Sequence, residues 1–584
     1  MNSTMKNVMT PGNASRALLL PFILLTVMGA QAATFTGSVV DINGSPVVGA
    51  MVTLEPSWPG PTYVTAFSDP DGRFSLPDQA NYRPGSEFQV AIRALGYELV
   101  DSSKEEEGGS VSLTVIARAT DNQAASAPAS AWLQDKADHD TTSTFVLDCV
   151  GCHQVPSPEF RHYAAAIADI PGADRDAIRH ASYDALVKYM NFLSAEEFGR
   201  GPEAGPPDAS RVYEVGDGPR VIDYLSANFT DRMDSVSGYD WGAPLAVTPQ
   251  TAIMEYEVPR PNAIREALLL GEPKQLWAAD VASNAIVKID PESGYTSSLE
   301  VPSDTPVGPH SLHRGADGSL WVAPFITSVV GHLDVNDETW DTWRMQTVNG
   351  TPTGIHDLSF GAEHTLLTDN DGLVWFSDIV NNAVGYLDPD TGAIDHYMAP
   401  PVLDRATTGT ALYGLVMTSD REEIWFSQLN IGSIGSFNVV TREFGPSFQL
   451  PLNSGPRRLS ISDDDILYVP LYGTGQLVEY DTKTHTQIGI YDMPDMASAP
   501  YAVTWDPVRK VVWIPTSNTD VIYKFDPADK SFTVLPMPRT GAFLRMVDID
   551  PDTGNLVTSY ANIVGHVHGP RMALIIDPGD GAYR

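Results

Sequence analysis

The sequence predicts a mainly β, multidomain protein with a β-sandwich, a small α-helical domain and a C-terminal seven-bladed β-propeller. Three observations carry this prediction. Short alternating strands with Gly and Pro turns fill residues 33–118, helical spacing replaces them over 144–232, and a strand-rich repeat runs from 250 to 584. A chain of 584 residues is too long for one core, and 42% hydrophobic residues is ordinary for a globular protein.

The N-terminus has the pattern of an export signal. Lys6 and Arg16 supply positive charge, Leu18 to Met28 form an apolar run, and Ala30-Gln31-Ala32 offers a small-x-small cleavage site. The alternative, a membrane anchor, needs a longer apolar run. We therefore expect a signal peptide over 1–32, a periplasmic or secreted location, and no membrane span after cleavage.

The charge balance limits the partners. The chain has 36 basic and 74 acidic side chains, a net charge of −38. Such a surface repels nucleic acid and anionic lipid, so neither is expected as a partner. It is compatible with docking to a basic redox partner protein.

Residues 33–118 read as strand, tight turn and strand. Thr36 to Asp41 and Ala50 to Leu54 flank the turn Gly44-Ser45-Pro46, and a second hairpin turns at Asp71-Gly72. This segment resembles the carboxypeptidase regulatory-like (transthyretin-like) sandwich, which implies a structural or docking role. Residues 119–143, rich in Ala, Ser, Asp and Thr, are predicted to be a linker.

The two cysteines lie in the motif Cys149-Val150-Gly151-Cys152-His153, which has the C-x-x-C-H form. Two thiols at this spacing add across the vinyl groups of haem, and the adjacent histidine becomes the proximal iron ligand. A redox disulfide or half a zinc site would leave His153 unexplained. We therefore predict covalent haem c attached through Cys149 and Cys152 with His153 on the iron.

The flanks of the motif resemble a small cytochrome c. Residues 144–149 could end a first helix, and 219–229 form an amphipathic closing helix with Val221, Ile222, Leu225 and Phe229 on one face. For the second axial ligand we name Met190, because Met/His ligation is usual in electron transfer. Met190 also fits plain helical core packing, and the rivals are Met233, His162, His180 or an open position.

From 250 onward, an aromatic residue is followed thirteen residues later by Asp or Asn. The pairs are Trp277 and Asp290, Trp321 and Asp334, Trp375 and Asp388, Trp425 and Asn438, Tyr468 and Asp481, and Trp513 and Asp526, with a degenerate seventh copy from Leu556 to Asp577. Seven copies of about four strands predict a seven-bladed propeller. Residues 251–256 are expected to supply the outermost strand of the last blade and close the ring.

These repeats resemble the virginiamycin B lyase (streptogramin lyase) family, in phrases such as Gly308-Pro309-His310 and Trp375-Phe376-Ser377-Asp378. The resemblance implies a propeller, and it implies an elimination that uses Mg²⁺ held by glutamates and a histidine base. At the position after the "WFT" phrase, where an acid often stands, the seven copies read Asp280, Pro324, Asp378, Gln428, Leu471, Thr516 and Tyr560. The lyase chemistry therefore does not transfer residue by residue.

Alignment on the "GPHGI" phrase places five polar side chains at equivalent points of one channel mouth. They are His310, His356, Tyr413, Arg457 and Tyr501. Such a set could hold an anionic or phenolic ligand or a divalent metal, and it could also be the ordinary lining of a solvated channel.

Three functions remain open. The first is an exported haem c protein in electron transfer, or an oxidoreductase, whose propeller binds a small-molecule substrate or a redox partner. The second is a Mg-dependent lyase with an accessory haem domain, and the third is a non-catalytic binding scaffold. Because elimination moves no electrons, the haem motif favours the first.

Overall fold

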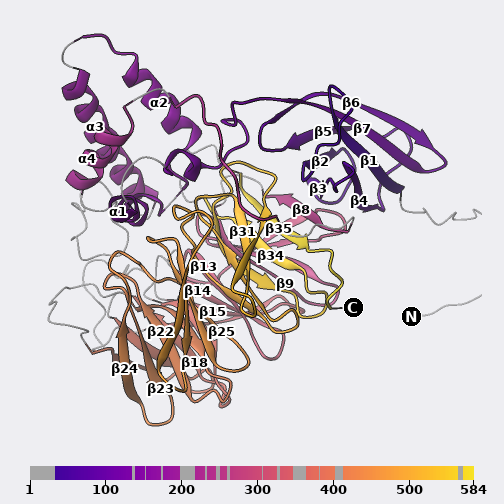
Figure 1. The fold of residues 1–584 in the computed structure, drawn as a ribbon. Coiled ribbons are helices and arrows are strands. Elements are labelled where there is room, and N and C mark those ends of the chain that lie inside the picture. Colours follow the sequence, from indigo (N-terminus) through magenta and orange to yellow (C-terminus); the bar gives the residue numbers. More distant parts are fainter. Residues whose placement is uncertain are drawn as a thin grey trace, which may run out of the picture.

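The computed structural model describes residues 33–134, 139–151, 153–172, 175–197, 218–230, 233–244, 250–258, 263–304, 307–324, 329–345, 363–379, 382–400, 412–562 and 570–583. The predicted signal peptide, Cys152 and His356 lie outside these residues. Within them the chain forms 35 strands, four α-helices and one 3-10 helix, so the protein is mainly β. Figure 1 shows the helices, the first strands and the strand-rich C-terminal part as three units.

The N-terminal unit consists of two sheets packed around one core. The first sheet has the order β4-β1-β7-β6, and the second contains β3-β2-β5. The strands are β1 (Ala33–Asp41), β2 (Met51–Pro56), β3 (Tyr63–Phe67), β4 (Arg73–Gln79), β5 (Phe88–Arg93), β6 (Tyr97–Glu107) and β7 (Ser110–Ala119). Alternate residues of β7 are buried, and Val111, Leu113 and Val115 join Phe35 and Val52 in the core between the sheets.

The segment predicted as a linker is packed rather than loose. It contains the 3-10 helix η1 (Ala129–Trp132), and Trp132 and Leu133 are buried. The Arg161 guanidinium lies 4.0 Å above the Trp132 ring, a cation–π contact. The low overall hydrophobicity of this segment predicted a linker, because composition alone does not reveal a few buried side chains.

The helical unit comprises α1 (His139–Cys149), α2 (Pro158–Ala168), α3 (Arg175–Glu197) and α4 (Gly218–Asn228). It begins before the predicted boundary at 144, and α1 ends at Cys149 as expected. The predicted apolar face of α4 is confirmed, because Val221, Ile222, Leu225 and Phe229 are all buried. The helices α1 and α4 are in contact, and Phe145 stacks on Tyr224 with ring centroids 4.2 Å apart.

The C-terminal unit is a β-propeller of four-stranded antiparallel sheets. Its buried marker residues Trp277, Trp375, Trp425 and Trp513 lie on the second strand of their sheets. Six sheets follow the chain order: β9 (Ile264–Leu270), β10 (Gln275–Asp280), β11 (Ala285–Ile289) and β12 (Thr296–Glu300); β13 (Pro309–Arg314), β14 (Leu320–Pro324), β15 (Val329–Asp334) and β16 (Thr339–Arg344); β17 (Glu363–Thr368), β18 (Val374–Asp378), β19 (Ala383–Leu387) and β20 (Ile394–Met398); β21 (Leu412–Met417), β22 (Glu423–Gln428), β23 (Ser433–Asn438) and β24 (Glu443–Gln449); β25 (Ser460–Ile461), β26 (Ile466–Leu471), β27 (Gln476–Asp481) and β28 (Thr486–Asp492); and β29 (Thr504–Asp506), β30 (Val511–Pro515), β31 (Val521–Asp526) and β32 (Ser531–Pro536).

The last sheet joins the two ends of the propeller. It contains β33 (Leu544–Ile549), β34 (Leu556–Tyr560) and β35 (Met572–Asp577), and its fourth strand is β8 (Ala252–Glu257), as predicted. The first strands of neighbouring sheets are in contact from β9 through β13, β17, β21, β25 and β29 to β33, and β33 contacts β9 again. The other edge of β8 pairs with β3, so that one seven-stranded sheet runs from the propeller into the N-terminal unit.

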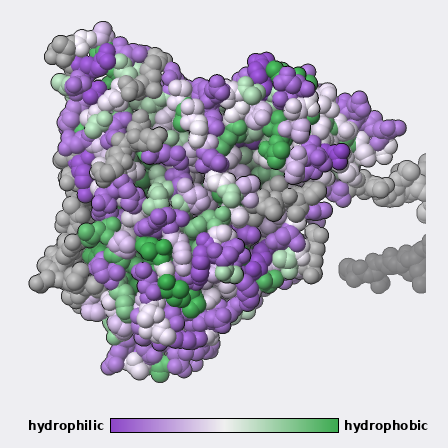
Figure 2. Space-filling view, viewed as in Figure 1, coloured by the Kyte–Doolittle hydropathy of each residue, from purple (hydrophilic) through white to green (hydrophobic). Residues whose placement is uncertain are grey.

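The helical unit packs directly on the propeller. One core cluster contains Val146 and Val150 of the helical unit together with Tyr413, Tyr472 and Tyr501 of the propeller. Hydrophilic side chains cover most of the face shown in Figure 2, with smaller hydrophobic patches between them. Among the described residues, no helix is long and apolar enough to cross a membrane.

Candidate functional site

One position recurs on the first strand of each sheet or just before it, eleven or twelve residues before the aromatic marker on the second strand in the six sheets that have this marker. His310 on β13 and Tyr413 on β21 lie at this position, and Arg457 and Tyr501 lie just before β25 and β29, where their backbone N–H groups bond to the second strands of their sheets. The first strand of the third sheet is β17, which carries His364 at this position, and the predicted His356 lies outside the described residues. The first and last sheets add Arg265 and Arg545, which the sequence analysis missed.

Four of these side chains form a connected network, which we call the channel cluster: Tyr413, Arg457, Tyr501 and Arg545. The hydroxyls of Tyr413 and Tyr501 are hydrogen-bonded to each other. Arg457 Nη1 donates to the Tyr413 hydroxyl at 3.3 Å, and Arg545 donates to the Tyr501 hydroxyl. The cluster therefore places two guanidinium groups on either side of a hydroxyl pair.

Arg457 lies inside a cage of tyrosine rings. Its guanidinium carbon is 3.8 Å from the ring centre of Tyr472, 4.7 Å from that of Tyr501 and 5.6 Å from that of Tyr413. The side chain is 5% exposed, and within the described part of the chain its Nε has no hydrogen-bond partner. Burial alone would lower the pKa of Arg457, but the three tyrosine hydroxyls raise it, so the group stays charged.

The next residue in sequence, Arg458, belongs to a second, charge-balanced network. Arg458 forms an ion pair with Glu266 at 2.5 Å and also donates to the Ser311 hydroxyl. His310 Nδ1 lies 3.0 Å from that same hydroxyl. Since these residues come from the fifth, first and second sheets, their contacts cross the channel. The structure thus brings His310 close to Arg458, and Tyr413, Arg457 and Tyr501 close to one another.

The cysteine motif lies against the channel cluster. The Tyr472 hydroxyl donates to the carbonyl oxygen of Val150, the residue after Cys149. Tyr472 and Tyr501 also touch edge to face, with ring centroids 5.9 Å apart. One aromatic side chain thus contacts both the motif and the buried Arg457.

Two polar side chains of the sixth sheet hold the residues that follow the motif. Asn518 accepts from the Val155 backbone N–H at 3.0 Å and donates to its carbonyl at 3.3 Å. Asp520 accepts from Gln154 Nε2 at 2.6 Å. The chain on both sides of His153 is therefore fixed to the propeller.

His153 itself has a defined tautomer. Its Nδ1 lies 2.7 Å from the Gln154 carbonyl oxygen, which can only accept, so Nδ1 carries the proton and Nε2 carries the lone pair. Burial lowers the pKa of His153, which favours the neutral ring. Cys149 packs against the core cluster that the helical unit shares with the propeller.

The possible second ligands differ in their surroundings. Met190 is partly buried on α3, whereas Met233 is buried in the core cluster with Tyr183. His162 is exposed with Nδ1 2.8 Å from the Pro158 carbonyl, and His180 lies 3.4 Å from Asp223 at the surface. Met190 remains the prediction for this position.

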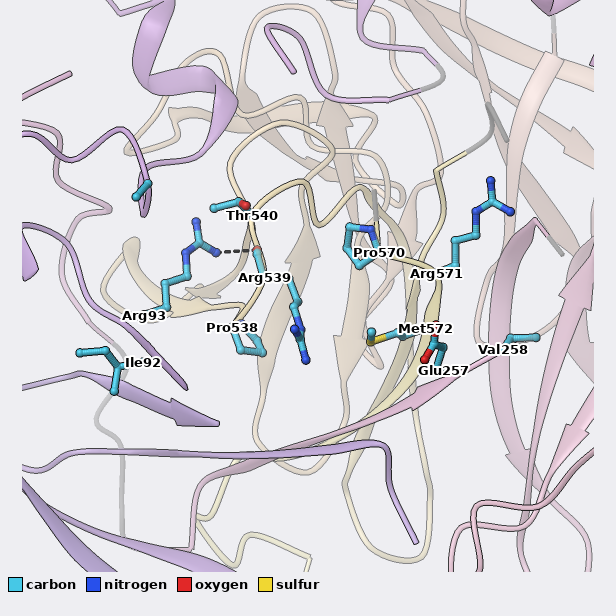
Figure 3. Close-up of a pocket in the computed structure, with 11 residues that line it drawn as sticks. Ile92, Arg93, Glu257, Val258, Pro538, Arg539, Thr540, Pro570, Arg571 and Met572 are labelled. Carbon is cyan, nitrogen blue, oxygen red and sulfur yellow. Dashed lines mark hydrogen bonds between the residues drawn. The ribbon is translucent and has the colours of Figure 1, made fainter. Parts of the chain in front are cut away.

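A cavity of about 440 Å³ lies between the N-terminal unit and the propeller (Figure 3). Arg93, Arg539 and Arg571 contribute to its wall, together with Glu257. The Arg93 guanidinium donates hydrogen bonds to Asp520 and to the carbonyl oxygens of Ser126, Met537 and Arg539. The dashed line in Figure 3 marks the bond to Arg539. This wall is therefore largely committed to joining the two units.

The two acids that follow the "WFT" phrase have structural partners. Asp280 accepts from the backbone N–H of Ala263 at 2.8 Å and of Ala282 at 3.1 Å, and Asp378 lies 3.6 Å from His396. Among the described residues, no group of three or more His, Cys, Asp or Glu side chains is placed to hold a metal ion.

The comparisons with known proteins agree on the propeller part of the chain. Residues 246–469 match the model of the virginiamycin B lyase family, so this segment is virginiamycin B lyase-like. No curated protein shows a significant match.

Similar solved structures include the virginiamycin B lyase of Staphylococcus aureus, with 15% identity over 56% of this chain and 99% of that chain and a TM-score of 0.46. A streptogramin B lyase has 18% identity over 56% and 97%, with a TM-score of 0.45. The β-propeller domain of Cps50 (Swd1) from Myceliophteria thermophila has 12% identity over 55% and 99%, with a TM-score of 0.43.

Proposed function

We propose that the protein is an exported haem c protein, an electron-transfer protein or oxidoreductase, whose helical unit caps the channel of a seven-bladed propeller. In this proposal residues 1–32 direct export to the periplasm or beyond. The N-terminal unit is a carboxypeptidase regulatory-like docking module, and residues 144–232 are a cytochrome c-like domain. The contacts among the first strands of the sheets support a closed ring of seven blades.

The residues around the motif fit a covalent haem. Cys149 and Cys152 would supply the two thioethers, and His153 would offer its Nε2 lone pair to the iron. The Nδ1–H of His153 is already held by the Gln154 carbonyl, the arrangement that orients a ligand histidine. When bound, haem c supplies one-electron chemistry at its iron. Met190 would be the second ligand.

The single observation that carries the proposal is the hydrogen bond from Tyr472 to the carbonyl of Val150 within the motif. It places the motif next to the buried cations and tyrosines of the channel cluster. A redox group at this point would be in direct contact with whatever the channel binds, either a small molecule or a docked partner.

The first test is haem attachment. The full-length chain is expressed with a cytochrome c maturation system beside Cys149→Ala/Cys152→Ala, and visible spectra are recorded on denatured protein. Haem that stays with the wild type after denaturation and is missing from the double variant supports the proposal. Wild-type protein without covalent haem would refute the proposal.

The second test is electron exchange. Small-molecule reductants and a basic cytochrome partner are mixed with the oxidised protein, and the rate of haem reduction is followed by absorbance. The matched variant Tyr472→Phe should change the rate with a reductant that enters the channel. It should leave the rate with a reductant confined to exposed haem edges unchanged.

The second candidate function is a lyase of the streptogramin lyase type, and the family match over residues 246–469 favours it. It predicts ring opening of a cyclic depsipeptide ester that depends on a divalent metal and persists in Cys149→Ala/Cys152→Ala. The recurring position carries three arginines, two tyrosines and two histidines but no acid, so Mg²⁺ would find few of its preferred oxygen ligands there, and this candidate ranks second.

A further inference from the structure

We infer that the channel cluster is a binding site for a small carboxylate, with Arg457 as the group that binds its negative charge. The inference goes beyond the proposed electron transfer, because it stands on the propeller's own side chains and holds with or without attached haem. Neither the lyase resemblance nor the cysteine motif calls for such a site.

The first argument is charge balance. Arg457 and Arg458 are neighbours in sequence, and both are buried. Arg458 has the carboxylate of Glu266 at 2.5 Å, whereas Arg457 forms no ion pair within the described part of the chain. A buried charge without a counter-charge is costly, and the tyrosine rings and hydroxyls around Arg457 repay only part of that cost.

The second argument is the open donor. Among the described residues, Arg457 Nε is buried without a hydrogen-bond partner, as is Arg458 Nε, while Arg457 Nη1 donates to the Tyr413 hydroxyl. A buried donor that makes no bond is rare in native proteins and calls for a missing acceptor. An oxyanion supplies both the acceptor and the missing charge.

The third argument concerns the ligand's chemistry. A guanidinium offers parallel N–H groups in one plane, which match the two oxygens of a carboxylate. The tyrosine rings pack on the Arg457 guanidinium, and Arg545 adds a second positive charge nearby, on the far side of the Tyr413–Tyr501 hydroxyl pair. A small carboxylate, aliphatic or aromatic, meets these requirements, and a divalent cation does not.

The test compares carboxylates with neutral molecules of the same shape. Binding of acetate against acetamide, and of benzoate against benzamide, is measured by isothermal titration calorimetry on the full-length protein with haem. The same titrations are repeated on Cys149→Ala/Cys152→Ala, so that loss of haem and loss of the anion site are scored separately. We expect at least one carboxylate to bind with one site per chain, and its amide to bind at least roughly tenfold more weakly, the loss expected for one charged hydrogen bond.

The variants are Arg457→Gln and Arg545→Lys, with Arg539→Gln as the control at an arginine of the other cavity. Arg457→Gln should abolish carboxylate binding, Arg545→Lys should weaken it, and Arg539→Gln should leave it intact. Thermal unfolding gives an independent measurement: the carboxylate should raise the melting temperature of wild type and not that of Arg457→Gln. Equal binding of acid and amide by wild type, or unchanged carboxylate binding by Arg457→Gln, overturns the inference. If Arg457→Gln does not fold, the acid–amide comparison and Arg545→Lys decide.

Discussion

Arg93 of the N-terminal unit and Asp520 of the propeller form an ion pair of 2.8 Å in which the side chains are 6% and 0% exposed. The two residues are 427 positions apart in sequence. Asp520 also accepts from Gln154 after the cysteine motif and from the Ala542 backbone N–H. One carboxylate therefore joins all three units of the protein.

Replacement of Asp520 by Ala should be strongly destabilising. It leaves the Arg93 guanidinium buried without its counter-charge, and losing one partner of a buried pair costs about 3–5 kcal/mol. Urea unfolding followed by tryptophan fluorescence measures the change. The control is Glu98→Ala, which breaks the exposed pair with Arg118 and should cost no more than about 1 kcal/mol. Similar losses in the two variants would show that the buried pair has no special role.

Tyr472→Phe should weaken the docking of the helical unit. The buried Val150 carbonyl loses its donor, at a cost of about 1–3 kcal/mol. Hydrogen exchange of α1, read by mass spectrometry, should quicken. Tyr480→Phe is the matched control, because the buried Tyr480 hydroxyl has no hydrogen-bond partner among the described residues. In this variant, hydrogen exchange of α1 should match that of the wild type. Unchanged protection of α1 in Tyr472→Phe would contradict the docking role.

Asp548 gives a prediction for the dependence of stability on pH. Burial raises the pKa of Asp548 to about 6 despite the ion pair with Arg314 at 2.8 Å. A raised pKa means that the folded state holds the proton more tightly than the unfolded chain, where the pKa is about 3.9. The stability from this group is therefore fully present below about pH 4 and is lost as pH rises through about 6.

The variant Asp548→Asn isolates this effect. Between pH 4 and pH 7, the stability of wild type relative to the variant should fall on the order of 1–2 kcal/mol. Denaturant midpoints at several pH values measure it, and other titrating groups cancel in the difference. A difference that is flat or rises with pH would show that Asp548 keeps an ordinary pKa in the folded protein.

Met190 can be tested once haem attachment is established. If Met190 is the second ligand, Met190→Ala should remove the methionine-to-iron charge-transfer band of the oxidised haem and lower the reduction potential. Met233→Ala, which opens the buried core instead, should reduce stability by about 2–5 kcal/mol and keep the band. Loss of the band only in the Met233 variant would reassign the ligand.

Much of the propeller was predictable because its repeat is local. A tryptophan on the second strand and an Asp thirteen residues later are fixed by the hairpin between them, so Trp277 and Trp513 reveal their sheets directly. The prediction of His356 followed the Gly-x-His phrase, and that residue lies outside the described residues, whereas the spacing to Trp375 selects His364. His310 lies eleven residues before Trp321, and His364, not His356, lies eleven before Trp375. A spacing of twelve to Trp277 finds Arg265, and the same spacing to Val557 on the second strand of the last sheet finds Arg545.

The contacts between units could not be predicted. The sequence pattern around Arg93 predicts only a half-buried edge strand. The residues near Asp520 in sequence give no indication that this carboxylate pairs with an arginine of another unit. The hydrogen bond between Tyr472 and Val150 likewise depends on how one folded unit rests on another. Packing of this kind is a property of assembled surfaces, which local periodicity does not encode.

The shared strand β8 has a consequence for how the chain is built during synthesis. Its two partners are made at very different times: β3 precedes it, and β35 is made only after the other six sheets of the propeller. Because domains fold from the N-terminus as they emerge, β8 can be held in extended form by the finished N-terminal unit while the remaining blades are still being made. β35 can then pair with a strand that is already held in place. Until β35 is made, one edge of β8 is exposed. At this stage a chaperone or a second copy of the chain would compete with β35 for that edge.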